Sequence, residues 1–85
     1  MDVYKVYLKE SIQKDFRLIP NNDIKKILRR IESLSYDPRP PGCEKLTDRE
    51  QYRVRQGRYR IVYSVQDNES TVYIVKIAHR KDIYR

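Results

Sequence analysis

The second half of the chain places apolar residues at every other position, and this period of two constrains the fold more than any other feature. Residues 52–55 and 59–65 alternate aromatic or aliphatic side chains with polar ones, while residues 71–78 are nearly continuous Val, Tyr and Ile. Alternation is typical of strands with one buried face, and a continuous apolar run is typical of a central strand. We predict three successive strands, separated by turns at residues 56–57 and 67–70.

The first half predicts one further strand and two helices. Residues 3–8 alternate and indicate an opening strand. Ile12, Phe16 and Ile19 then follow at helical spacing, and Pro20 ends this short helix. A second helix is marked by a continuous apolar stripe at Ile24, Ile27, Leu28, Ile31 and Leu34.

The order of these elements predicts an α+β fold. The proline-rich segment 37–42 cannot continue a helix and is expected to form a loop. A strand, two helices and then three strands indicate a two-helix hairpin packed on one face of a small antiparallel sheet, with the other face free. A chain of 85 residues can bury only one core, so we predict a single domain over residues 1–85.

The charge of the chain predicts a polyanionic partner. Nineteen Lys and Arg residues against twelve Asp and Glu residues give a net charge of +7, which favours nucleic acid. No apolar run is long enough to cross a membrane, and the N-terminus does not resemble a signal peptide, so we expect a cytoplasmic protein. Cys43 and His79 are the only residues of their kinds, so we expect no disulfide, no zinc site and no cofactor.

Arginines alternate with apolar residues on the first two of the three predicted strands. A turn at residues 56–57 would place Arg53 opposite Arg60 and Arg55 opposite Arg58. Like charges so opposed destabilise a sheet, so an anion such as a phosphate backbone would relieve the repulsion on the open face that Arg53, Arg55 and Arg60 share. The alternative is a solvated basic face that only keeps the protein soluble.

The end of the last strand carries residues suited to proton transfer. His79 can act as acid or base because an ordinary imidazole titrates near pH 6.5, whereas Arg80 stays charged and can only stabilise negative charge. Lys81 adds a further cation there. Tyr84 can stack on a base or transfer a proton. The alternative is that the single histidine is structural or solvated.

Three segments together resemble the RelE/ParE toxin superfamily. They are Tyr-Arg-Val-Arg at 52–55, Gly-Arg-Tyr-Arg-Ile-Val-Tyr at 57–63 and Ile-Ala-His-Arg-Lys-Asp-Ile-Tyr at 77–84. The resemblance covers essentially the whole chain and agrees with the predicted order of elements. It implies a RelE-type toxin of a type II toxin-antitoxin pair, an endoribonuclease that needs no metal and cuts mRNA in the ribosomal A site.

The resemblance also implies roles for individual residues. In the family's reaction the 2′-hydroxyl of the RNA attacks the adjacent phosphate, so the protein supplies a base, an acid and positive charge. Arg60 and Arg80 match the arginines that stabilise the phosphate and serve the leaving group. Tyr84 matches a C-terminal tyrosine that stacks on the substrate.

One departure from the family pattern concerns the general base. Arg53 and Arg55 stand where the well-studied ribosome-dependent member has lysines, and an arginine, with its pKa above 12, is a poor base. We therefore assign the base or acid role to His79, which gives the catalytic set Arg60, His79, Arg80 and Tyr84. The side chains expected to bind RNA phosphates are Arg53, Arg55, Arg58 and Lys81.

The resemblance implies partners and a rival function. The expected partners are mRNA, the ribosome and an acidic, RelB-like antitoxin, with operator DNA bound only through that antitoxin. ParE-like members instead poison DNA gyrase by protein contacts and cleave no RNA. Joint presence of Arg60, Arg80 and Tyr84 favours the RNA-cleaving branch, and a third alternative is an RNA-binding domain without turnover.

Overall fold

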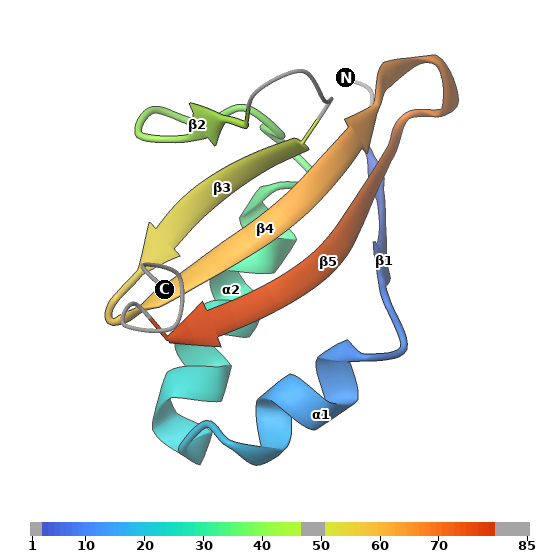
Figure 1. Cartoon of the computed structure of the whole chain (residues 1–85). Coiled ribbons are helices and arrows are strands. Elements are labelled where there is room, and N and C mark those ends of the chain that lie inside the picture. Colours follow the sequence, from blue (N-terminus) through green and yellow to red (C-terminus); the bar gives the residue numbers. More distant parts are fainter. Residues whose placement is uncertain (1–2, 47–50, 80–85) are drawn as a thin grey trace.

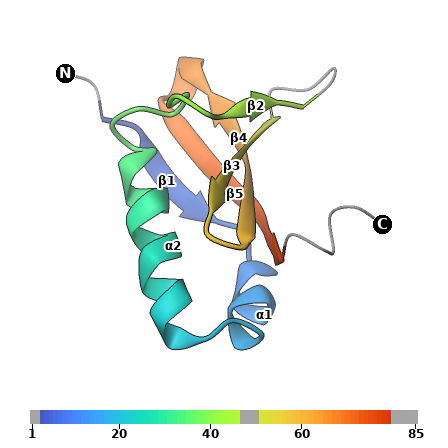
Figure 2. The ribbon, with the colours of Figure 1, turned by 90° about the vertical axis from the view of Figure 1, so that its left-hand side faces the viewer.

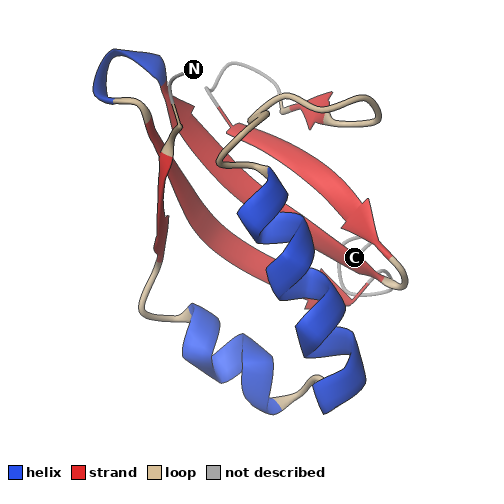
Figure 3. Cartoon of the chain, turned by 180° about the vertical axis from the view of Figure 1, so that it is seen from behind, coloured by secondary structure: helices blue, strands red, loops and turns tan. Residues whose placement is uncertain are grey.

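Two helices pack on one face of a five-stranded sheet in the computed structural model, which describes residues 3–46 and 51–79 (Figure 1). Figures 2 and 3 show both helices on the same side of the sheet. The elements are β1 (Lys5–Leu8), α1 (Ile12–Arg17), α2 (Asn21–Ser33), β2 (Glu44–Lys45), β3 (Gln51–Gln56), β4 (Tyr59–Gln66), a 3-10 turn (Asp67–Glu69) and β5 (Thr71–His79). The predicted α+β class, with its helical hairpin and three-stranded meander, is confirmed.

The sheet is mixed, which corrects the expectation of a wholly antiparallel one. Its strand order is β1-β5-β4-β3-β2, and β1 runs parallel to β5, with Lys5 paired to Thr71 and Leu8 to Ile74. The helical hairpin carries the chain back to the end of the sheet where β1 began, so β3 starts in the same direction as β1. Because β4 runs antiparallel to β3, and β5 antiparallel to β4, β5 has the same direction as β1.

The short strand β2 was not predicted. Glu44 pairs with Arg53 and Lys45 with Tyr52, which adds β2 to the outer edge of β3. Two residues are too few to show a periodic pattern, so only the folded chain reveals this strand.

The core lies between α2 and the helix-facing side of the sheet. Ile27, Ile31 and Leu34 are at most 5% exposed. The alternating apolar residues of β3 and β4 are buried as the predicted period of two requires, namely Tyr52, Val54, Tyr59, Ile61 and Tyr63. Leu28 is the exception on the predicted helical stripe, because 42% of its surface remains exposed. No helix in the described ranges is long and apolar enough to cross a membrane.

A polar cluster fastens the proline-rich loop to the sheet. The Arg39 guanidinium donates to both carboxylate oxygens of Asp67, at 3.1 and 2.8 Å, and through Nε to the Tyr52 hydroxyl at 2.9 Å. The Tyr4 hydroxyl donates to Asp67 Oδ1 at 2.7 Å. Hydrogen bonds from Arg39 and then Tyr4 lower the pKa of Asp67 to about 2. This cluster fixes the course of the loop that leads into β2.

The two neighbouring apolar residues of α2 provide a test of this packing. Ile27→Ala is expected to lower the free energy of unfolding by roughly 2–5 kcal/mol, because it removes buried methyl groups and leaves a cavity. Leu28 lies on the same helix but is half-exposed, so Leu28→Ala is expected to lower the free energy of unfolding by well under half of that amount. Urea unfolding followed by circular dichroism measures both, and equal losses would contradict the assignment of the buried face.

The Asp67 cluster predicts a pH-dependent contribution to stability. A carboxyl whose pKa falls from 3.8 to about 2 on folding stabilises the native state above about pH 4, and this stabilisation is lost as the pH falls toward 2. Asp67→Asn is therefore expected to lower the urea midpoint at pH 7, with the difference from wild type shrinking between pH 4 and pH 2. The exposed Glu10→Gln serves as control, and a constant difference across this range would exclude the linkage.

Candidate functional site

A tight turn sets the pairing of the hairpin formed by β3 and β4. Gln56 pairs with Tyr59, so the two central residues are Gly57 and Arg58, one position later than predicted. Gly57 has a φ of +61°, as in the type II′ turn, where glycine occupies the first central position. Arg58 therefore lies exposed at the tip of the turn and not on the face of the sheet.

This turn changes which arginines oppose each other. Arg55 pairs with Arg60, and Arg53 pairs with Val62, so the predicted pairs Arg53 with Arg60 and Arg55 with Arg58 are wrong. The observed pairing of β3 with β4 is shifted by two residues from the predicted one. A shift of two residues keeps every side chain on its predicted face of the sheet, whereas a shift of one residue would move it to the other face. Arg53, Arg55 and Arg60 therefore share the face that points away from the helices, as the alternation predicts.

The three arginines line a cavity of about 290 Å³ at the β3 edge. Its remaining lining residues are Gly42, Glu44 and, from the helix-facing side, Arg30 of α2 and Val54, so the cavity extends around the β3 edge. Arg60 is only 3% exposed, which corrects the expectation that it stands open to solvent. Arg60 has paired strands on both sides, Ala78 of β5 and Arg55 of β3, whereas β2 pairs with β3 only at Tyr52 and Arg53 and leaves Arg55 exposed. A guanidinium removed from water attracts an anion more strongly than an exposed one.

Glu44 brings a carboxylate into this cavity. Arg53 donates to Glu44 Oε2 through Nη2 at 2.6 Å and through Nε at 3.0 Å. The hydrogen bonds and charge of Arg53 lower the pKa of Glu44, and the charges of Arg60 and Arg55 lower it further. Glu44 is therefore ionised at neutral pH. Sequence reasoning missed it because β2, which carries it, has no periodic pattern.

His79 lies on the other face of the sheet from this cavity. It ends β5 in register with Tyr59, and their rings meet edge to face at 5.4 Å between centroids. Tyr59 faces the helices, where its hydroxyl donates to Asp23 Oδ2 at 3.4 Å, while Arg60 pairs with Ala78. The structure thus places His79 on the strand next to the arginine hairpin but does not bring it together with Arg53, Arg55 and Arg60.

The remaining predicted site residues are Arg80, Lys81 and Tyr84, which lie outside the described residues. Their roles stay predictions. Among residues 3–46 and 51–79, no three His, Cys, Asp or Glu side chains gather in a way that could hold a metal ion. Cys43 is half-buried and packs against the core.

Comparison with known proteins identifies the family of this chain. Residues 6–84 match the family described as the ParE toxin of the type II toxin-antitoxin system parDE. A protein of Methanocaldococcus jannaschii assigned as toxin RelE1 is 31% identical over 86 residues, which cover 96% of each chain.

Solved structures of similar proteins share the fold. The archaeal RelE-RelB complex from Pyrococcus horikoshii contains a chain that superposes with a TM-score of 0.79 at 26% identity, covering 92% of this chain and 96% of the other. The RelBE2 toxin-antitoxin complex from Mycobacterium tuberculosis gives a TM-score of 0.82 at 24% identity, with 94% of each chain covered. The matched family, the archaeal relative and the shared architecture agree: this chain belongs to the RelE/ParE family of toxins of type II toxin-antitoxin systems.

Proposed function

We propose that this toxin is a metal-independent endoribonuclease that cleaves mRNA in the ribosomal A site and so stops translation. The observation that carries the proposal is the cavity that Arg53, Arg55 and Arg60 line together with Glu44, whose carboxylate accepts hydrogen bonds from Arg53. Three guanidinium groups suit a phosphodiester, because their planar donors match phosphate oxygens and keep their charge at any physiological pH. An ionised carboxylate among them adds the proton acceptor that RNA cleavage requires.

The proposed reaction transfers a phosphate from the 5′-oxygen to the 2′-oxygen of the preceding ribose. The base takes the proton of the 2′-hydroxyl, the bond from the 2′-oxygen to phosphorus forms, and the bond to the 5′-oxygen breaks. The products are a 2′,3′-cyclic phosphate and a 5′-hydroxyl, whose proton comes from the acid. Negative charge grows on the phosphate oxygens in the transition state, where Arg55 and Arg60 would stabilise it.

We assign the base role to Glu44 in place of His79. An arginine stays protonated and cannot take the proton, and His79 faces the helices together with Tyr59. Glu44 lies in the same cavity as the arginines, and Arg53 holds its carboxylate in place. We assign His79 to the support of the β5 end, and Arg80 and Tyr84 keep the leaving-group and stacking roles that the family resemblance implies.

An antitoxin is the expected protein partner. The solved relatives from Pyrococcus horikoshii and Mycobacterium tuberculosis are toxin-antitoxin complexes. We propose an acidic antitoxin that covers the basic face of this chain, neutralises part of its +7 charge in the cytoplasm, and alone contacts operator DNA.

The second candidate function is that of a DNA gyrase poison, and the match to the ParE toxin family favours it. Such a toxin would act through protein contacts and would have no need of the arginine-lined cavity. It predicts growth arrest with intact mRNA and gyrase-linked DNA breaks.

Primer extension on mRNA after brief induction tests the proposal. Cuts within translated codons are expected for the wild type. Glu44→Gln is expected to reduce cleavage by about 100-fold or more, because it removes the base while preserving shape. Arg55→Ala is expected to reduce it by roughly 10-fold or more through lost charge stabilisation. Arg29→Ala, an exposed arginine on α2, is the matched control and should cleave like wild type.

Glu44→Gln that folds and cuts at the wild-type rate would remove Glu44 from the reaction. Intact mRNA with arrested growth would instead favour the gyrase poison. Circular dichroism and binding to the antitoxin show whether each variant is folded.

The pH dependence of single-turnover cleavage distinguishes the two candidate bases. The pKa of Glu44 lies below its ordinary value of 4.5, so a Glu44 base remains ionised and the rate should stay level from pH 7.5 to pH 5.5. An ordinary histidine base would be mostly protonated at pH 5.5, and the rate would fall about 10-fold. If the cleavage rate of the wild type falls toward acid pH, and this fall disappears in the His79→Gln variant, His79 is the base.

A further inference from the structure

Two exposed tyrosines form a stacked pair on the same side of the sheet as the arginine cavity. Tyr7 of β1 and Tyr73 of β5 are register partners, and their rings stack with centroids 5.6 Å apart and planes 23° apart. Half of Tyr7 and 38% of Tyr73 remain exposed. Within the described ranges neither hydroxyl has a hydrogen-bond partner. The pair thus leaves a large aromatic surface open to solvent.

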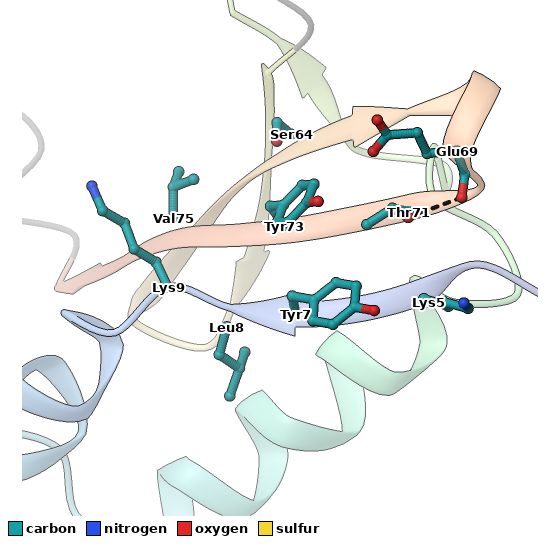
Figure 4. Close-up of a pocket in the computed structure, with 9 residues that line it drawn as sticks. All are labelled: Lys5, Tyr7, Leu8, Lys9, Ser64, Glu69, Thr71, Tyr73 and Val75. Carbon is teal, nitrogen blue, oxygen red and sulfur yellow. Dashed lines mark hydrogen bonds between the residues drawn. The ribbon is translucent and has the colours of Figure 1, made fainter.

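Space for a planar ligand lies beside this pair, in a cavity of about 730 Å³ (Figure 4). Tyr73 stands between Tyr7 on one strand and Ser64 on the other, since Ser64 is its partner on β4. Ser64 has a small side chain, Tyr73 keeps 38% of its surface exposed, and Val75 also lines this space. A planar group placed above Ser64 would continue the stack begun by the two tyrosines.

The charges around this cavity suit a nucleic acid. Lys5 and Lys9 line it from the two ends of β1, and Glu69 is the one carboxylate among its lining residues. Aromatic rings that stack on bases, with cationic side chains beside them for phosphates, are the usual means of binding single-stranded nucleic acid.

The tyrosine pair and the arginine cavity can engage one continuous strand. Ser64 and Arg60 lie on the same face of β4, four residues apart, which corresponds to about 13 Å along a strand. A ligand could reach from Arg60 to Ser64 along this one face of β4. A strand cut near Arg60 could therefore place a neighbouring base over Ser64.

We propose that Tyr73, supported from behind by Tyr7, stacks on an unpaired base of the RNA substrate a short distance from the cut phosphate, while Lys5 and Lys9 bind the adjoining backbone. This rests on the proposed ribonuclease function and adds a second contact to it. The contact tolerates any base, because every base has a π-face, and it positions the strand in the arginine cavity.

The test uses the full-length toxin and a short single-stranded RNA whose 2′-hydroxyls are methylated to prevent cleavage. A 2-aminopurine base is placed at successive positions, because its fluorescence falls when it stacks on an aromatic ring. We expect quenching at a position next to the cut site. Tyr73→Leu should abolish this quenching and weaken binding about 5- to 150-fold, the equivalent of one lost stacked base. Tyr73→Phe keeps the ring and should bind like wild type.

Two further variants separate stacking from effects on folding. Ser64→Leu leaves both tyrosines intact but fills the space beside Tyr73, so it should also remove the quenching. Tyr36→Leu replaces a tyrosine that is 70% exposed in the loop after α2, and it should change nothing. If Ser64→Leu retains wild-type quenching and affinity, or if Tyr73→Leu matches Tyr36→Leu, the stacking site is wrong.

The outcomes also separate this inference from the proposed function. Binding that falls with Arg55→Ala but not with Tyr73→Leu overturns the stacking site and leaves the ribonuclease proposal intact. A wild-type toxin that does not bind the RNA at low salt overturns the stacking site, while primer extension still tests the ribonuclease proposal by itself. If Tyr73→Leu weakens binding of the antitoxin and leaves RNA binding unchanged, the tyrosine pair is a protein contact and the inference fails.

Discussion

The tight turn at Gly57 is the constraint on which the rest of the site depends. A positive φ at this residue closes the hairpin in two residues and sets Arg55 opposite Arg60. The alternation along β3 and β4 then sends Val54 and Ile61 into the core and the arginines to the opposite face. Burial of the apolar face against α2 thereby stabilises an arrangement of like charges that would be unfavourable on its own.

The carboxylate reaches these arginines through long-range contacts. The Arg39–Asp67 ion pair at 2.8 Å and the hydrogen bond from the Tyr63 hydroxyl to the Pro38 carbonyl at 2.8 Å attach the proline-rich loop to the sheet. That loop leads directly to β2, where Glu44 pairs with Arg53. In the absence of an RNA phosphate, Glu44 offsets part of the repulsion among the arginines. The same contact would hold the base in position for catalysis.

The two faces of the sheet hold different features of the protein. The helix-facing side holds the core and also His79, packed against Tyr59. The open side holds the arginine cavity and, farther along, the Tyr7–Tyr73 pair. A single strand of RNA lying along the open side would meet positive charge, a proton acceptor and a stacking surface in turn.

The sequence alone determined the α+β class, the family and the face on which Arg53 and Arg60 lie, because each follows from a local period of two or a short motif. Only the tertiary structure decided that Arg55 opposes Arg60, that β1 runs parallel to β5, and that Glu44 rather than His79 shares the arginine cavity. Alternation assigns a residue to a face but not to a partner. Partners depend on where a turn closes and on contacts between distant segments, which local patterns do not encode.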